Sequence, residues 1–364
     1  MIPGPSDPEP EVLAELSLPI LPHYGDKWMT VYTETTGMMQ KVFRTDNEVL
    51  LLPIPGQLSV EMAAVNLVAK GQEALVCVNG VFSQNIVEAI KAVGGKPVEV
   101  PAEFGKGNTL DQVKSVVEGL KDPAGRSIFI VQNETSTGAA VNPAEIFRYC
   151  KSKGMFTVLD SISAIGGMDL RADEWSVDYA IGYSSKAMSG VNGVVPVSIS
   201  KEVWELAKKR RGQALSTFLD LNAWREAIDE DSSWGHPHPT SMPTSVIVAL
   251  RKAASLALTE GLENRYRRHA EVAKEMREGL HELGLPVFTD PAYYSNTVSV
   301  GKVDAKWDLE FRKRLVSEYN IMIAGGLGPL RGKVVRIGHM GSSAKPEKVR
   351  LTLAAMHQVL KKVR

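Results

Sequence analysis

Two residues with complementary chemistry, an acid and an amine, follow two short apolar runs in the middle of the chain. Asp160 ends the run FTVLD at 156–160, and Lys186 follows the run VDYAIGY at 177–183 after two serines. In an open α/β sheet, ligands bind beyond the carboxyl ends of the strands, so we expect these two side chains to meet at one edge. A lysine that forms a Schiff base and an acid that keeps a pyridine nitrogen protonated together suit pyridoxal 5'-phosphate.

Each member of this pair also has an ordinary structural explanation. A lysine after a strand is most often a loop residue whose ammonium stays in water. An aspartate after a strand often caps a helix or forms a turn. The pair therefore predicts a cofactor site only together with the segments around it.

Three segments in combination resemble a known family. They are LDSISAIGG at 159–167, GYSSKA at 182–187 and IAGGLGPLRGKVVRIGHMG at 323–341. These are similar to the small class V aminotransferases of the alanine–glyoxylate or serine–pyruvate type, and the resemblance runs from about residue 3 to the C-terminus. It implies an α/β protein of the fold-type I architecture, with a mostly parallel seven-stranded sheet in a large domain and a smaller C-terminal α+β domain. It also implies a homodimer with shared active sites.

The composition narrows the class of protein. The chain has 364 residues, of which 44% are hydrophobic and 23% are charged, which is typical of a globular protein with more than one domain. Lysine plus arginine equals aspartate plus glutamate at 42 each, so nothing indicates nucleic acid as a partner. No apolar run approaches the roughly 20 residues that span a bilayer, and we expect no membrane association and no metal.

The expected location is the cytoplasm. Two cysteines, Cys77 and Cys150, cannot form a disulfide framework and suit a reducing compartment. The N-terminal residues show no secretory signal pattern, and the C-terminal residues show no peroxisomal address.

The pattern of segments predicts three parts. Residues 1–20 are proline-rich and are expected to form an extended arm rather than a packed element. Residues 21–260 alternate strands with amphipathic helices and form the predicted large cofactor-binding domain. Residues 261–364 form the predicted small domain, with helices at 262–284, 306–319 and 345–363 and strands at 296–301, 320–324 and 333–338.

The segment PIPGQ at 53–57 joins a predicted strand to an amphipathic helix. Such a turn can bind phosphate, because free N–H groups and the positive end of the helix dipole point at one spot, whereas a plain strand–helix turn is the alternative. Pro53 and Pro55 depart from the family pattern, which is rich in small residues and hydroxyls, and a proline offers no N–H. The phosphate must therefore depend more on other groups or bind less tightly. The predicted contacts are Gly56, Gln57 and Leu58.

Other cofactor contacts are implied by the resemblance. Phe82 would stack on the ring, and Thr135 would donate to its phenolate oxygen. Ile162 lies two residues after the acid and would therefore cover a face of the ring. Glu134 is carried over as an active-site residue without an assigned role.

Two further groups of residues are implied contacts of the phosphate. Ser185, with Ser184 as the second candidate, would donate from beside the lysine. In the family, a loop crosses the dimer interface and contacts the partner's phosphate. In this chain the candidates in that loop are, in order of preference, Thr240, His238 and Ser241.

Arg336 lies within the apolar run VVRIG at 334–338. A guanidinium in such a strand needs a partner, and its planar fork suits a carboxylate. The family uses the arginine of this motif to bind the substrate's α-carboxylate. A structural salt bridge is the alternative.

Together these residues predict a transaminase that acts by a ping-pong Schiff-base mechanism. It would move an amino group from alanine or serine to a 2-oxo acid such as glyoxylate or pyruvate. Lys186 would move the proton, which requires a pKa lowered by burial and a neighbouring cation.

Three alternatives stay open. The altered PIPGQ turn allows a less usual amine, as in the pyridoxamine–pyruvate, 2-aminoethylphosphonate or ureidoglycine type. A pyridoxal-phosphate-dependent lyase or desulfurase is less favoured, because the two cysteines lie in a predicted strand and a predicted helix rather than in a mobile loop. The third alternative is a non-catalytic binding protein of the same fold.

Overall fold

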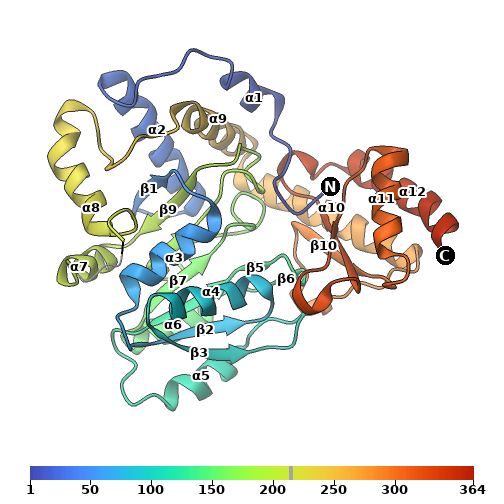
Figure 1. The fold of residues 1–364 in the computed structure, drawn as a ribbon, viewed down its shortest axis with the longest axis horizontal. Coiled ribbons are helices and arrows are strands. Elements are labelled where there is room, and N and C mark those ends of the chain that lie inside the picture. The colour runs from blue at the N-terminus through green and yellow to red at the C-terminus, as the bar shows by residue number, and fades with distance from the viewer. Residues whose placement is uncertain (213–215) are drawn as a thin grey trace.

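The largest element of the computed structural model, which describes residues 1–212 and 216–364, is a seven-stranded sheet (Figure 1). Its strand order is β1-β9-β8-β7-β4-β2-β3. Strands β3, β2, β4, β7 and β8 run parallel, and β9 pairs antiparallel with β8 and β1. This confirms the predicted mostly parallel sheet. The strands are β1 (Glu48–Leu52), β2 (Glu73–Val78), β3 (Lys96–Pro101), β4 (Ser127–Val131), β7 (Phe156–Asp160), β8 (Tyr179–Ile181) and β9 (Val195–Ile199).

Both faces of this sheet are buried, which explains why its strands are apolar throughout. In β4, Ile128 and Ile130 join the core on one face, whereas Phe129 and Val131 join the core on the other. The first core is closed by α2 (Asp26–Phe43), α5 (Leu110–Glu118), α6 (Ala144–Ser152) and α9 (Thr244–Glu260). The second core is closed by α3 (Gly56–Leu67), α4 (Val81–Ala92), α7 (Lys201–Lys209) and α8 (Leu221–Glu226).

A smaller unit, drawn in orange and red in Figure 1, contains the C-terminal part of the chain. Its antiparallel sheet has the order β10-β12-β11, and its helices pack on a separate core. The predicted strand at 320–324 is wrong in its bounds: Asn320 ends the preceding helix in the left-handed region, and the strand that pairs with β12 here consists of Ala324 and Gly325. The elements are α10 (Leu262–Glu282), β10 (Val298–Lys302), α11 (Asp308–Tyr319), β11 (Ala324–Gly325), β12 (Val334–Gly338) and α12 (Pro346–Val363).

The division into a large and a small domain at residue 260 coincides with the junction of α9 and α10 and stays a prediction. A two-stranded hairpin, β5 (Asn133–Glu134) and β6 (Ala139–Ala140), follows β4. None of the helices in the described part of the chain is long and apolar enough to cross a bilayer. Short turns of other helix types are Ala227–Asp231, Ser232–Trp234, Pro291–Tyr293, Gly328–Leu330 and Gly341–Ser343.

The observed structure of residues 1–20 differs from the prediction of an extended, unpacked arm. Residues 10–15 form α1 (Pro10–Glu15), because a proline is tolerated in the first turn of a helix, and Val12 is fully buried against α9. Residues 1–7 are also fixed, since the carbonyl of Met1 accepts a hydrogen bond from the amide of Gly338 at 2.9 Å. Residues 1–7 and Val12 of the arm are therefore packed on the fold, whereas Leu18 and Ile20 near its end are exposed.

Candidate active site

The carboxyl ends of β4 and β7 border a cavity of about 180 Å³. Asp160 ends β7 and pairs in register with Ile181 of β8, so the acid and the loop after β8 emerge at the same edge of the sheet. Among the residues that line the cavity are seven of the predicted cofactor contacts. They are Gly56, Gln57, Phe82, Thr135, Asp160, Ile162 and Lys186.

The carboxyl group of Asp160 is buried and has a single backbone donor among the described residues. The amide of Ile162 donates to its Oδ1 at 2.9 Å, and the residue is 8% exposed. Burial raises the pKa of Asp160 to about 7, and the charge of Glu134 acts in the same direction. A cationic ring nitrogen beside this carboxyl would lower its pKa again, because an opposite charge favours the ionised form.

Lys186 has the opposite shift. Burial lowers the pKa of Lys186 to about 8, the charge of Arg336 adds to this effect, and Asp160 opposes it. Its ammonium donates to the carbonyl of Pro3 at 2.7 Å. A lysine with this pKa is neutral in a useful fraction near physiological pH, as a base requires.

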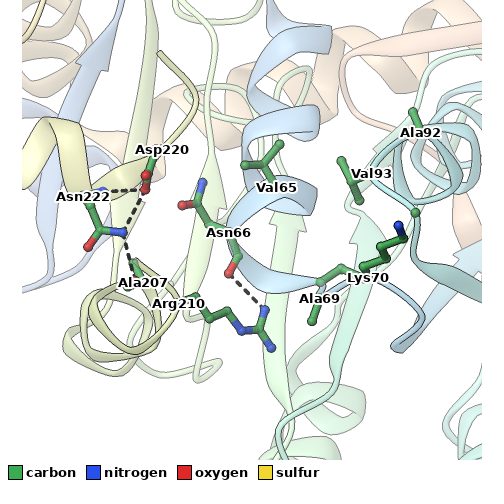
Figure 2. A pocket seen from close by; sticks show the side chains of 12 residues that line it. Val65, Asn66, Ala69, Lys70, Ala92, Val93, Ala207, Arg210, Asp220 and Asn222 are labelled. Carbon is green, nitrogen blue, oxygen red and sulfur yellow. Dashed lines mark hydrogen bonds between the residues drawn. The ribbon is translucent and has the colours of Figure 1, made fainter. Parts of the chain in front are cut away.

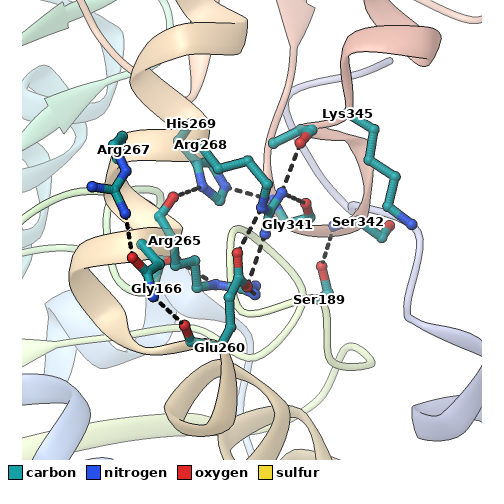
Figure 3. A network of polar contacts seen from close by, with 12 residues as sticks. Gly166, Ser189, Glu260, Arg265, Arg267, Arg268, His269, Gly341, Ser342 and Lys345 are labelled. Atoms are coloured by element: carbon teal, nitrogen blue, oxygen red, sulfur yellow. Dashed lines mark hydrogen bonds and ion pairs between the residues drawn. The ribbon is translucent and has the colours of Figure 1, made fainter.

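The loop that carries Lys186 is held from the small unit by a polar network (Figure 3). Arg265 of α10 donates to the carbonyl of Ala187 at 2.6 Å and to the carbonyl of Gly166 at 2.7 Å. The hydroxyl of Ser189 accepts from the amide of Ser342 at 2.7 Å. The backbone position of the lysine therefore depends on contacts with both units of the fold.

Arg336 extends from β12 toward this site without a carboxylate partner among the described residues. Its Nε donates to the carbonyl of Gly325 at 2.8 Å, and its Nη1 lies 3.4 Å from the carbonyl of Thr135. The arginine is 8% exposed, and burial lowers its pKa to about 10. Among the described residues, Arg336 therefore does not form the structural salt bridge that was the alternative interpretation. A guanidinium has five donors, and these two bonds leave it able to bind an anion.

The turn before α3 offers fewer backbone donors than the sequence predicted. The amide of Leu58 donates to the carbonyl of Pro55 at 3.0 Å, and Leu58 is absent from the cavity lining. Within the described residues, no carbonyl outside helix α3 accepts from the amides of Gly56 and Gln57. These two amides, at the positive end of α3, are the donors that remain for a phosphate.

The two serines before Lys186 point their hydroxyls at other groups. Ser185 donates to the side chain of Asn192, and Ser184 donates to the carbonyl of Val191. Ser185 lines a neighbouring, more open hollow that shares Tyr183 and Lys186 with the cavity, and it does not line the cavity itself. The structure therefore does not bring either serine into the cavity.

His238 is not placed for contact with a partner subunit. It is fully buried, its Nε2 accepts from the indole of Trp28 at 2.9 Å, and its Nδ1 lies 2.8 Å from the carbonyl of Thr240. Burial, followed by the neighbouring His236, lowers the pKa of His238 to about 4. Thr240 is half-buried and Ser241 is exposed, so these two stay accessible.

Five residues of the lining were not predicted: the apolar Val60 and Val131, and the polar Asn133, Ser163 and Tyr183. The amide nitrogen of Asn133 donates to Ser163 and to Thr297, but its side-chain oxygen is buried without a partner among the described residues. Asn133 belongs to the polar run NETST after β4, and that run was the available signal. An unpaired acceptor at the cavity fits a ligand that carries a donor.

A larger hollow of about 470 Å³ lies elsewhere, beside α3 and α7 (Figure 2). Arg210 donates to the carbonyl of Asn66 at 3.2 Å, and Asn222 donates to the carbonyl of Ala207 and to Asp220 at 2.9 Å each. These groups already have hydrogen-bond partners, and Figure 2 shows Lys70 and Asp220 of the lining at opposite sides of the hollow rather than facing each other. Size alone therefore does not make this hollow the catalytic site.

The groups around the smaller cavity fit pyridoxal phosphate. A buried acid is available for a ring nitrogen, an amine for an aldehyde, and two amides at a helix start for a phosphate. Phe82 and Ile162 supply apolar surface for the faces of a ring. The site also lies at the sheet edge where ligands of open α/β folds bind.

Comparison with known proteins gives consistent matches over the whole chain. The sequence model of the class V aminotransferases matches residues 20–343. An uncharacterized aminotransferase of Methanocaldococcus jannaschii is 32% identical, over 100% of this chain and 92% of its own length. The structure of ureidoglycine–glyoxylate aminotransferase from Bacillus subtilis has a TM-score of 0.93 at 26% identity, over 100% of this chain and 92% of that chain. Alanine–glyoxylate aminotransferase from Nostoc sp. has a TM-score of 0.92 at 27% identity, over 99% and 94%.

Proposed function

This chain belongs to the class V aminotransferase family, and we propose that it uses pyridoxal 5'-phosphate to transfer the amino group of alanine or serine to glyoxylate or pyruvate. The transaminase class follows from the family. The cofactor, the donor and the acceptor are the proposal. The supporting observation is that Asp160 and Lys186 line one small cavity. Arg336, which has no carboxylate partner among the described residues, lies 3.4 Å from the carbonyl of Thr135, and Thr135 lines the same cavity.

Pyridoxal phosphate, when bound, supplies an aldehyde that takes up the amino group and a ring that accepts electrons. Asp160 would hold the proton on the ring nitrogen, because a buried carboxylate stabilises a neighbouring cation. Phe82 and Ile162 would lie against the ring, and the hydroxyl of Thr135 would donate to its oxygen. The amides of Gly56 and Gln57 would bind the phosphate.

The substrate would be held at two points. Arg336 would bind the α-carboxylate through charge-assisted hydrogen bonds, and this fixes the Cα atom relative to Lys186. The amine of Lys186 would then accept the proton from Cα of the substrate, and the same amine would later donate it. Its lowered pKa supports this role, since a base must be neutral at the pH of the reaction.

We also propose that the enzyme is a cytoplasmic homodimer whose active sites are shared. Apolar side chains are exposed in the arm and near it, notably Ile20 at 82% and Trp234 at 58%, and such surfaces favour an interface. Thr240 and Ser241 would contact the phosphate of the partner's site. Both cysteines are free and buried, which agrees with a reducing compartment.

A second candidate is a transaminase of a less usual amine, such as ureidoglycine, 2-aminoethylphosphonate or pyridoxamine. The specific observation in its favour is the reduced set of phosphate donors before α3, where the Leu58 amide is already used. A desulfurase is disfavoured, because Cys77 and Cys150 are buried in β2 and α6 rather than in a loop over the site.

One experiment distinguishes these possibilities. The absorption spectrum of the purified protein is recorded, a panel of amines is added, and 2-oxo acids are then supplied. We expect alanine or serine to remove the cofactor band and glyoxylate or pyruvate to restore it. A response only to ureidoglycine, 2-aminoethylphosphonate or pyridoxamine would select the second candidate. The absence of a band, or a band that persists in Lys186→Ala, would refute the proposed site.

A further inference from the structure

Residues 1–7 of the arm contact both sides of the candidate active site. The carbonyl of Met1 accepts from the amide of Gly338, two residues beyond Arg336 on β12, at 2.9 Å. The carbonyl of Pro3 accepts from the ammonium of Lys186 at 2.7 Å. The segment thus runs from the strand that carries the arginine to the amine of the lysine.

We propose that this segment positions the reactive amine, with the carbonyl of Pro3 as its hydrogen-bond acceptor and Gly4 as the residue that permits so close an approach. The inference rests on the proposed function, because it assumes that Lys186 is the lysine that reacts. Pro3 and Gly4 are positioning residues, since they act through the lysine.

A buried amine needs an acceptor, and the nature of that acceptor matters. Pro3 is buried, and its carbonyl is the hydrogen-bond acceptor of Lys186 among the described residues, whereas Asp160 interacts with the lysine only through its charge. A carboxylate in direct contact would stabilise the ammonium and raise its pKa. A neutral carbonyl instead fixes the direction of the amine and stabilises the ammonium less than a carboxylate would.

The approach of the arm depends on glycine for two independent reasons. Gly4 has a φ of +103°, which side chains with a Cβ rarely adopt. A Cβ at this position would also lie 2.2 Å from Nζ of Lys186 and 2.6 Å from its Cε. Any side chain at residue 4 must therefore displace either the lysine or the arm.

Neighbouring contacts hold the arm in register with the loop of the lysine. The amide of Ser6 donates to the carbonyl of Ser185 at 2.8 Å, and its hydroxyl donates to the carbonyl of Lys186. The carbonyl of Asp7 accepts from the hydroxyl of Ser342 in the small unit. The Pro3 carbonyl is therefore fixed relative to the backbone of Lys186 and to the small unit at once.

The test compares Gly4→Ala with the matched control Gly71→Ala in the full-length holoenzyme. Gly71 has a φ of +78°, but an added Cβ there meets no atom within 4 Å, so the control carries the backbone strain without the contact. Four quantities are measured: the pH midpoint of the cofactor absorption band, the rate at which alanine removes that band, the KM for alanine, and the midpoint of thermal unfolding, which reports whether the variant folds. We expect Gly4→Ala to slow the reaction at least about tenfold with little change in KM and to shift the pH midpoint.

The control should stay within about twofold of the unsubstituted enzyme in rate and keep its pH midpoint. Unchanged rate and pH midpoint in Gly4→Ala would overturn the inference. The proposed function itself fails in a different way, through a cofactor band that survives in Lys186→Ala.

A second pair of variants covers the case in which Gly4→Ala does not fold. Ser6→Ala removes the hydroxyl contact to the carbonyl of Lys186, whereas Ser17→Ala removes an exposed contact to the carbonyl of Ala14. We expect Ser6→Ala to shift the pH midpoint of the cofactor band and to slow the reaction about threefold or more, and Ser17→Ala to do neither. Identical behaviour of the two serine variants would overturn the inference.

Discussion

Arg336 of β12 and Thr135 of the loop after β4 are 201 residues apart in sequence, yet the guanidinium lies 3.4 Å from the threonine carbonyl. Thr135 lines the cavity that contains Asp160 and Lys186. This contact places a buried cation from the small unit beside a cavity that the large sheet forms. The site is complete only when both units are in place.

Arg336→Ala should raise KM for both the amino and the 2-oxo substrate. A lost charge-assisted contact with a carboxylate is worth about 2–4 kcal/mol, which corresponds to a factor of about 30 to 1,000. The exposed Arg331→Ala in the same segment is the control and should change KM little. Steady-state kinetics with alanine and glyoxylate check this, and an unchanged KM in Arg336→Ala would mean that another group binds the carboxylate.

Asp160 should make the cofactor-free protein less stable as the pH rises. Its pKa is 3.8 when exposed and about 7 in the fold, so the folded state binds the extra proton between these values. Stability therefore falls from pH 4 to pH 7 and stays low above it, by about 4 kcal/mol at most. Asp160→Asn should remove this dependence, as measured by urea unfolding at pH 4.5 and pH 7.5.

The matched control for this prediction is Asp46→Asn, which changes an exposed acid. Its pH dependence should follow that of the unsubstituted protein. If the unfolding free energies of Asp160→Asn and the unsubstituted protein differ by the same amount at both pH values, the carboxyl of Asp160 does not titrate as the structure indicates.

The parts of the site that the sequence predicted are those that local pattern determines. The run FTVLD reads as a buried strand that ends in an acid, and VDYAIGY as another that precedes a lysine. Parallel neighbours in one sheet bring such ends together whatever the rest of the chain does. Asp160 and Lys186 accordingly line one cavity.

The parts that the sequence did not predict depend on partners far away along the chain. His238, between two prolines, is typical of an exposed turn, but contacts with Trp28 and Tyr32 of α2 help to bury it. A proline-rich segment is typical of an unpacked arm. In the structure, however, the carbonyl of Pro3 accepts from the ammonium of Lys186, and the carbonyl of Met1 accepts from the amide of Gly338. Such contacts have no periodicity that a single sequence displays.

Arg265 should be required for the stability of the lysine loop. It is 4% exposed, it donates to the carbonyls of Ala187 and Gly166, and it pairs with Glu260 at 2.7 Å. Arg265→Ala leaves these acceptors buried without a donor and should lower the free energy of unfolding by about 3–5 kcal/mol. It should also slow the reaction with alanine, because the backbone of the lysine loses a support.

The control for Arg265 lies two residues away in the same helix. Arg267 is exposed, and its guanidinium donates to the side chain of Asn264, which is also exposed. Arg267→Ala should unfold at the same denaturant concentration as the unsubstituted protein. If Arg265→Ala does so as well, the network in Figure 3 does not support the loop.

His238 and Thr240 lie two residues apart but should differ in what their substitution changes. His238→Ala leaves the buried indole N–H of Trp28 without an acceptor, so it should lower the free energy of unfolding by about 1–3 kcal/mol. Thr240 is more accessible, and Thr240→Ala should instead raise the dissociation constant of pyridoxal phosphate in the proposed dimer while the unfolding of the cofactor-free protein stays unchanged. Unfolding in urea and equilibrium titration with the cofactor separate the two effects. Weaker cofactor binding only in His238→Ala would contradict the assignment of Thr240 to the partner's phosphate.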